Sequence, residues 1–231
     1  IDGGGHQATS LEFFLKNFPN ADQFQTHSFE INPDFEKYFK PHIDYKNHFF
    51  YNMAIWTEDG EIQFYKMDGE SSTVSSHSYS RHNATVRSID FSKWLINNFK
   101  KEDYIVLKLD IEGAEFSVLP KMFEDNTIDL IDELFIEFHY GKRKNTSIEL
   151  SLSILEKLIF QYNLEPKRWN ATGKDISTDK IELDWRLCRD LEKEKPNSDF
   201  GRRWKKIKDY FGFEKYSKGM PIYSPKEKEK K

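Results

Sequence analysis

The chain has 231 residues, enough for one well-filled domain and a small appendage, and its net charge of −4 argues against a protein that mainly coats nucleic acid. Hydrophobic residues make up only 37%, but 20 Phe, 11 Tyr and 5 Trp supply enough apolar area for a core. The one cysteine, Cys188, excludes an internal disulfide and a cysteine-based metal cluster, as is typical of a reducing compartment. No apolar run approaches the roughly 20 residues that span a bilayer. We therefore expect a cytoplasmic protein without a membrane span.

Three consecutive glycines follow the short apolar start of the chain. Asp2 and then Gly3, Gly4 and Gly5 are interpreted as the end of a strand and a turn, and an amphipathic helix is predicted over residues 8–18. Without Cβ atoms the turn lets a ligand approach the backbone near the start of the helix. The alternative is an ordinary flexible turn.

A second strand is predicted over residues 24–31, with Glu30 at its end. An acid there accepts hydrogen bonds from both hydroxyls of a ribose in dinucleotide-binding folds, whereas the alternative is a solvated strand end. Residues 48–56 and 61–65 are predicted as the next strands. The polar stretch 67–83, which contains His77 and His82 as expected surface residues, is a candidate mobile lid. A helix capped by Ser88 is expected over residues 88–99.

The most informative segment is a buried strand predicted over residues 104–109, followed at once by three carboxylates, Asp110, Glu112 and Glu115. Ligands of open α/β sheets bind outside the carboxyl ends of the strands, where Asp110 and Glu112 fall. The dipole of the following helix explains Glu115 and partly Glu112, because it favours acids in the first turn. It does not explain Asp110, which we interpret as functional.

The next strand, predicted over residues 128–138, places a second polar pair at the same edge of the sheet. Glu137 and His139 are two residues apart and therefore point the same way. A helix is predicted over residues 147–162, and residues 166–169 and 181–187 are candidate last strands in a hairpin-like pair. We expect one domain over residues 1–190 and a charged, partly disordered extension over residues 191–231.

Strands that alternate with helices predict an α/β fold with a mostly parallel central sheet and helices on both faces. The order of glycine turn and strand-end acids resembles Rossmann-like class I S-adenosylmethionine-dependent methyltransferases, and more closely the FkbM family. The resemblance covers residues 1–162, although the turn reads Gly-Gly-Gly-His where the family usually has a Gly-Ala-Asn type. The segments that carry it are residues 2–5 (Asp-Gly-Gly-Gly), 29–33 (Phe-Glu-Ile-Asn-Pro), 86–90 (Val-Arg-Ser-Ile-Asp), 107–115 (Leu-Lys-Leu-Asp-Ile-Glu-Gly-Ala-Glu) and 135–139 (Phe-Ile-Glu-Phe-His).

The resemblance implies O-methylation of a hydroxyl of a sugar, glycan or similar small polyol, with S-adenosyl-L-methionine as the methyl donor. It implies that Glu112, Glu115 and Arg87 lie near the acceptor, and that the lid residues 71–87 select it. The residues that it implies for binding the cofactor are Asp2, Gly3, Gly4, Gly5, Glu30 for the ribose, Asn52, Met53 and Ala54 near the adenine, and Asp110.

A neutral sugar hydroxyl is a poor nucleophile, so methyl transfer to it needs a base or a metal ion. His139 is the best candidate base, with Asp110 and Glu137 as its catalytic partners. The same three residues equally form an oxygen-rich site with one imidazole, which suits Mg²⁺ or Mn²⁺. Both alternatives stay open at the level of sequence.

Two other functions compete with this one. An RNA- or protein-directed methyltransferase would use the basic stretch 202–208 with Trp204 and Tyr210, although nearby acids dilute its charge. The second alternative is a non-catalytic binding module of the same fold. The first strand is nearly missing from the sequence, so we also expect a domain of a longer polypeptide, with other domains that build the methylated glycan.

Overall fold

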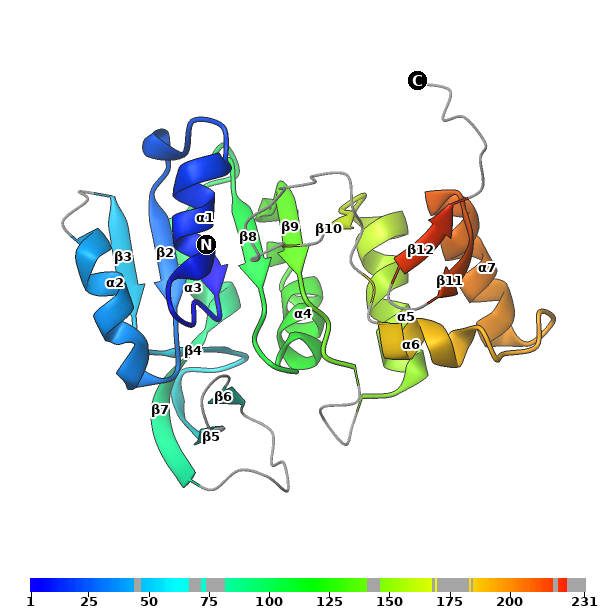
Figure 1. Ribbon diagram of the computed structural model, residues 1–231, viewed down its shortest axis with the longest axis horizontal. Coiled ribbons are helices and arrows are strands. Elements are labelled where there is room, and N and C mark those ends of the chain that lie inside the picture. The colour runs from blue at the N-terminus through cyan, green and yellow to red at the C-terminus, as the bar shows by residue number, and fades with distance from the viewer. Residues whose placement is uncertain are drawn as a thin grey trace.

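The computed structural model describes residues 1–43, 47–66, 72–73, 82–140, 146–167, 169, 183, 185–217 and 220–223. These residues form an α/β protein whose central sheet is parallel and flanked by helices, as Figure 1 shows. This confirms the predicted fold class at the level of its sheet and layers. None of the described helices is long and apolar enough to cross a membrane.

The first half of the chain supplies three strands of the central sheet, the helices between them and a second small sheet. Its strands and helices are β1 (Asp2–Gly3), α1 (Thr9–Asn17), β2 (Thr26–Phe29), α2 (Glu36–Ile43), β3 (His48–Tyr51), β4 (Ala54–Trp56), β5 (Gly60–Lys66), β6 (Ser72–Thr73) and β7 (His82–Asp90).

The second half completes the central sheet and adds a helical layer with a terminal hairpin. Its elements are α3 (Phe91–Asn98), β8 (Val106–Leu109), α4 (Glu115–Glu124), β9 (Glu133–Ile136), α5 (Ile148–Glu156), β10 (Pro166–Lys167), α6 (Trp185–Leu191), α7 (Asp199–Phe211), β11 (Phe213–Ser217) and β12 (Met220–Tyr223). Short 3₁₀ turns at Ala21–Gln23, Pro33–Phe35 and Thr127–Leu130 and a π-helical turn at Lys157–Gln161 connect them.

The strand order of the central sheet is β10-β9-β8-β1-β2-β3, and every pair in it is parallel. The chain adds β2 and then β3 on one side of β1, and it later adds β8 on the other side of β1. The order therefore reverses between β1 and β8, which is where open α/β sheets bind ligands. The Asp110 N–H donates to the Gly3 carbonyl at 3.0 Å, so the glycine turn lies directly beside the end of β8.

Both faces of the sheet are covered because its strands carry apolar side chains on both sides. Leu11 of α1 and Phe39 of α2 pack together on one face. Phe91 of α3 and Met122 of α4 belong to the large core on the other face. This core continues into the C-terminal helices, where Trp204 of α7 is only 2% exposed.

The strand predicted over residues 128–138 is restricted to β9, because Thr127–Leu130 form a 3₁₀ turn. Three further local predictions were wrong, each because a tertiary partner decided the backbone. Residues 48–56 form two strands, since β3 pairs with β2 whereas β4 joins the second sheet, of order β4-β7-β5-β6. Ser88 does not cap a helix but lies in β7 opposite Gly60 of β5. The cap of α3 is Asp90, whose side chain accepts from the Lys93 N–H.

The third of these wrong predictions was the hairpin-like pair of strands near the C-terminus. Residues 166–167 do form β10, but β10 pairs in parallel with β9. Residues 185–191 form α6, a helix that packs beside α5 and α7. The helix predicted from residue 147 is confirmed, with the Ser147 side chain accepting from the Leu150 N–H. Most of the predicted lid, with His77, and the end of the charged tail lie outside the described residues.

Candidate functional site

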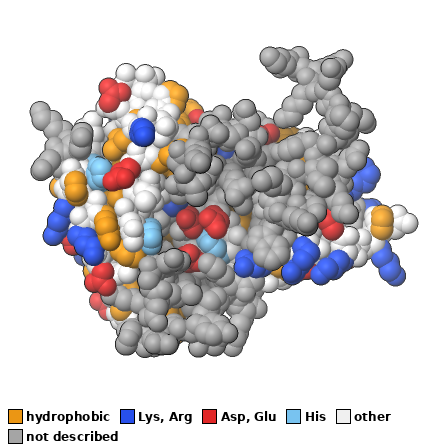
Figure 2. All heavy atoms as spheres, viewed as in Figure 1, with side chains coloured by type: hydrophobic (Ala, Val, Ile, Leu, Met, Phe, Trp, Pro, Cys, Tyr) orange, Lys and Arg blue, Asp and Glu red, His pale blue; other side chains and the backbone are white. Residues whose placement is uncertain are grey.

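Four carboxylates surround one imidazole at the carboxyl ends of β8 and β9. We call Asp110, Glu112, Glu115, Glu137 and His139 the carboxylate–imidazole cluster. The Glu137 N–H donates to the Leu109 carbonyl at 2.9 Å, which holds the two strand ends together. Acidic side chains and a histidine gather near the middle of the face that Figure 2 shows. The prediction that these strand ends meet at one edge is thus confirmed.

His139 is the centre of the cluster and is only 5% exposed. Its Nδ1 lies 3.1 Å from Glu115 Oε1. Its Nε2 faces the other three acids, at 3.7 Å from Asp110 Oδ1, 3.6 Å from Glu112 Oε2 and 3.6 Å from Glu137 Oε1. The two ring nitrogens therefore have different roles: one contacts a fully buried acid, whereas the other faces the partly exposed side of the site.

Glu115 shapes the loop that carries the other acids. Its two carboxylate oxygens accept from the Ile111 and Gly113 N–H groups, both at 2.8 Å, and its side chain is 0% exposed. Glu112 and Gly113 have φ of 55° and 98°, and a side chain at a positive φ is uncommon outside Asn and Asp. Buried behind His139, Glu115 orients the cluster and is too enclosed to meet an acceptor directly.

Lys108 belongs to this site although the sequence interpretation did not include it. Its ammonium lies 3.3 Å from Asp2 Oδ1 and 3.4 Å from Asp110 Oδ2, and it donates to the Gly4 carbonyl at 2.8 Å. Burial by itself would lower the pKa of Lys108, but the two carboxylates outweigh it and raise that pKa. The available signal was the charge inside an otherwise apolar strand, since a buried lysine is almost always paired.

The glycine turn packs tightly against the chain itself. A Cβ on Gly4 would lie 1.9 Å from the Asp110 carbonyl oxygen, and one on Gly5 would lie 2.7 Å from the Phe39 ring. The N–H groups of Gly4 and Gly5 both donate to the Phe29 carbonyl at 3.0 Å. Close packing of the chain against the turn thus explains why these residues lack Cβ atoms. The sequence interpretation had explained the same glycines by the approach of a ligand.

Glu30 is buried, with 5% exposure, so the alternative of a solvated strand end was wrong. Its carboxylate accepts from the His6 N–H at 2.8 Å and the Asn32 N–H at 2.7 Å, and burial raises its pKa. Asn52 donates to the Glu30 carbonyl at 2.8 Å. The glycine turn, the end of β2 and Asn52 therefore form one hydrogen-bonded unit. Each carboxylate oxygen keeps a further lone pair for a ligand hydroxyl.

The remaining predicted residues lie around this unit. Met53 is half-buried against the main core, and Ala54 is buried at the start of β4. Arg87 is exposed on β7, opposite Glu61 of β5. Within the part of the chain that the structure describes, no hydrogen bond or ion pair joins Arg87 to the cluster.

The cluster also contains a set of donors that suits a metal ion. Ligand atoms of Asp110, Glu112 and His139 all lie within 4.8 Å of one another. Two carboxylates and one imidazole are typical ligands of Mg²⁺ or Mn²⁺. The predicted set had Glu137 in place of Glu112, but the Glu137 side chain is 60% exposed and lies at the edge of this group.

The fold and site define an α/β protein, compatible with a Rossmann-like fold, whose candidate site lies where the strand order reverses. Residues 40–152, just under half of the chain, match a family model described as a domain of unknown function (DUF7870). The matched stretch contains the whole carboxylate–imidazole cluster but neither the glycine turn nor Glu30. Comparison with curated proteins gave no match, and comparison with solved structures gave none.

Proposed function

We propose that the protein is an S-adenosylmethionine-dependent O-methyltransferase that acts on a hydroxyl of a sugar, glycan or similar small polyol. The observation that carries this proposal is the position of the carboxylate–imidazole cluster beside the reversal of strand order. His139 Nε2 faces three carboxylates there, while Nδ1 contacts a fourth, buried one. A proton acceptor next to a ligand crevice is what the activation of an alcohol requires.

The donor would bind across β1, β2 and β8. Asp2 and Asp110 lie on either side of Lys108, and Glu30 with Asn52 lies at the end of the neighbouring strand. Glu30 would accept from the ribose hydroxyls, and the Asp110 side chain, 32% exposed, would face the sulfonium end. The Lys108 ammonium neutralises part of the negative charge of Asp2 and Asp110. The site would therefore bind a cationic donor without leaving several carboxylates close together and unpaired.

His139 would act as the base through Nε2. With its Nδ1–H donated to Glu115, the neutral imidazole keeps the lone pair of Nε2 on the side of the partly exposed acids. That lone pair would take the proton from the acceptor hydroxyl as its oxygen attacks the methyl group, while the bond from the methyl group to the donor sulfur would break and S-adenosylhomocysteine would leave. Much of the rate enhancement would come from holding the two reactants at attack distance.

Asp110, Glu112 and His139, with Glu137 beside them, would hold the metal ion in the alternative form of this mechanism. A bound Mg²⁺ or Mn²⁺ supplies Lewis acidity that lowers the pKa of an acceptor hydroxyl. The role of Glu115 is the same in both forms, since a ligating histidine also donates its other N–H to a carboxylate.

The structure weakens the RNA-directed alternative. Trp204, expected to stack on bases, is buried, and its indole N–H donates to Glu192 at 3.1 Å. The Arg203 guanidinium donates to Glu149 at 2.8 Å and to Glu156 at 2.9 Å. Both residues thus hold α7 against the rest of the protein, and neither supports a phosphate-binding surface.

The test is methyl transfer from labelled S-adenosylmethionine to a panel of sugars and glycans, with and without EDTA. We expect transfer to at least one hydroxylated acceptor. Loss of transfer in EDTA would select the metal form, and unchanged transfer would select the base form. Calorimetry with S-adenosylmethionine and S-adenosylhomocysteine separates binding from acceptor choice. A folded protein that takes up neither compound would overturn the proposal.

A further inference from the structure

Lys108 carries a charge into the middle of the central sheet. It lies in β8, between β1 and β9, and is only 4% exposed, while its neighbours Leu107 and Leu109 are fully buried. A buried ammonium is costly unless charged or polar partners surround it. The proposed methyl transfer does not use this ammonium directly, so its position needs a reason of its own.

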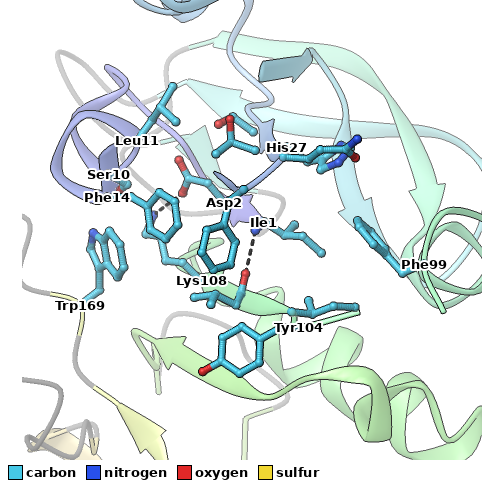
Figure 3. Close-up of a pocket in the computed structure, with 16 residues that line it drawn as sticks. Ile1, Asp2, Ser10, Leu11, Phe14, His27, Phe99, Tyr104, Lys108 and Trp169 are labelled. Carbon is cyan, nitrogen blue, oxygen red and sulfur yellow. Dashed lines mark hydrogen bonds and ion pairs between the residues drawn. The ribbon is translucent and has the colours of Figure 1, made fainter. Parts of the chain in front are cut away.

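The Lys108 ammonium contacts oxygen atoms at the ends of β1 and β8. It lies 3.3 Å from Asp2 Oδ1 and 3.4 Å from Asp110 Oδ2. It also donates to the carbonyls of Gly4 at 2.8 Å and Gly3 at 3.4 Å. Figure 3 shows the ion pair between Lys108 and Asp2. Two carboxylates and one ammonium therefore leave this group with one excess negative charge.

The N–H groups of the glycine turn do not share in this charge balance, because they have partners of their own. Those of Gly4 and Gly5 both donate to the Phe29 carbonyl at 3.0 Å. Burial by itself would lower the pKa of Lys108, but the two carboxylates raise it above its ordinary value, so the side chain stays charged at neutral pH. The ammonium therefore offsets the carboxylates without help from the turn.

Asp110 connects Lys108 with the reacting groups. Its Oδ2 faces the ammonium, whereas its Oδ1 lies 3.7 Å from His139 Nε2. The Asp110 side chain is 32% exposed, against 13% for Asp2 and 5% for Lys108. A ligand at this end of the sheet would therefore meet Asp110, and the ammonium would act on the ligand through that carboxylate.

Methyl transfer removes a positive charge from the donor side of the site. As the acceptor oxygen binds the methyl group, the methyl–sulfur bond breaks, its electron pair stays on sulfur, and the sulfonium becomes a neutral thioether. In the base form of the mechanism the proton of the acceptor hydroxyl passes to His139. A carboxylate beside the sulfonium therefore stabilises the donor more than the transition state, which slows the step. An ammonium behind that carboxylate offsets this effect.

We propose that Lys108 is a positioning residue that limits the preference of the site for the positively charged donor over its neutral product. It does so by holding Asp110 Oδ2, which divides the charge of that carboxylate between the ammonium and the ligand. This inference rests on the proposed methyl transfer, because the sulfonium is the charge to which Lys108 responds.

The alternative is a purely structural role, in which the ammonium only joins β8 to β1. S-adenosylmethionine and S-adenosylhomocysteine differ by the methyl group and by the charge that it confers on sulfur. Loss of a structural contact would weaken the binding of both compounds alike. Loss of a charge would change their relative affinity, so the ratio of the two dissociation constants separates the two roles.

The experiment is a charge series measured by calorimetry with both compounds. Lys108→Met removes one positive charge, so the affinity for S-adenosylmethionine relative to S-adenosylhomocysteine should rise at least about fivefold. Asp2→Asn removes one negative charge and should lower the same ratio by a similar factor. The double variant has the same net charge at this group as the unaltered protein, so its ratio should return to within about twofold of the original value.

Kinetics give a second readout of the same effect. Lys108→Met should lower both the KM for the donor and kcat, which is the combination expected when destabilisation of the bound donor is removed. Lys101→Met, at an exposed position, is the matched control and should change neither. Asp2→Asn keeps the ammonium paired with Asp110, so the ratio can be tested even if Lys108→Met does not fold.

The possible outcomes separate this inference from the proposed function. Equal ratios in the unaltered protein and its variants, with both compounds bound, would overturn the inference and leave the methyltransferase proposal in place. The same holds if Lys108→Met weakens the binding of both compounds alike. An unaltered protein that binds neither compound would overturn the methyltransferase proposal, and this inference with it.

Discussion

His139 Nδ1 lies 3.1 Å from a carboxylate oxygen of Glu115, and this pair joins the end of β9 to the first turn of α4. The Glu115 carboxylate also accepts from the Ile111 and Gly113 N–H groups. The orientation of the imidazole is therefore determined by an acid whose own position is held by the backbone of the loop that carries Asp110 and Glu112.

Replacing Glu115 by Gln should destabilise the protein and reduce methyl transfer together. The amide has only one acceptor oxygen, so one of the two N–H groups of the loop loses its partner, which costs about 1–3 kcal/mol. Poorer orientation of His139 should lower the rate by about 10- to 100-fold. Urea unfolding and transfer assays measure the two effects. Glu124→Gln, on the exposed side of the same helix, should change neither, and an unaffected Glu115→Gln variant would contradict the assigned role.

Asp110→Asn and His139→Gln should each reduce methyl transfer by at least about 100-fold, because each removes a group that meets the reactants. The folded state should persist, as judged by circular dichroism and the unfolding midpoint. Asp129→Asn, an exposed acid, is the matched control. If a variant with both substitutions retained activity, the proposed donor site would be unaffected, but the proposed roles of Asp110 and His139 in the chemistry would be wrong.

Lys108→Met should destabilise the protein by about 3–5 kcal/mol, because it leaves Asp2 and Asp110 without their buried cation. Adding Asp2→Asn to this variant should restore part of the loss, since one of the two uncompensated charges is then gone. Urea unfolding of both single variants and the double variant gives the coupling energy. Lys101→Met, at an exposed position, is the control. Simple additivity would rule out the coupling.

Two glycines with positive φ allow strain and packing to be separated. Gly4 and Gly212 have φ of +78° and +72°, but a Cβ would meet the Asp110 carbonyl oxygen at 1.9 Å only in the first case. Gly212→Ala should cost about 1 kcal/mol from backbone strain alone. Gly4→Ala should cost at least about 3 kcal/mol, since overpacking adds to the strain. Chemical denaturation measures the loss in free energy of unfolding for each variant. Similar losses for Gly4→Ala and Gly212→Ala would show that the turn can move away from β8.

Stability should fall as the pH is lowered from about 6.5 to about 4. Burial is the main cause that lowers the pKa of His27 and of His48 from 6.5 to about 4. The unfolded chain therefore binds more protons across this interval. The contribution of the two neutral histidines to the free energy of unfolding is fully present above pH 6.5 and is lost toward pH 4. Urea midpoints measured between pH 7.5 and 4 test this.

The variants His27→Asn and His48→Asn provide the control for this pH dependence. Each removes one titrating group, so the slope of stability against pH should become shallower even if the overall stability falls. His27 also interacts with Tyr51, through Nδ1 at 3.1 Å from the hydroxyl, so only the slope is diagnostic. An unchanged slope in both variants would assign the acid sensitivity to other groups.

Local patterns predicted much of the fold because they concern neighbours in sequence. The apolar run that ends at Asp110 and the start of the helix at residue 147 were predicted in place. Residues 48–56 and Ser88 were misassigned because their conformation depends on strands distant in the chain. β4 pairs with β7, and β7 pairs with β5. The periodicity within one segment does not indicate with which other strand that segment will pair.

The amino-acid sequence alone determined that acids close two strands of a parallel sheet and that a glycine turn closes a third. Only the tertiary structure decided which of these groups touch: Glu115 contacts His139, Lys108 lies between Asp2 and Asp110, and Gly3 and Gly4 pack against the end of β8. The physical reason is that a strand end is a local property, whereas the distance between two side chains depends on sheet order and register.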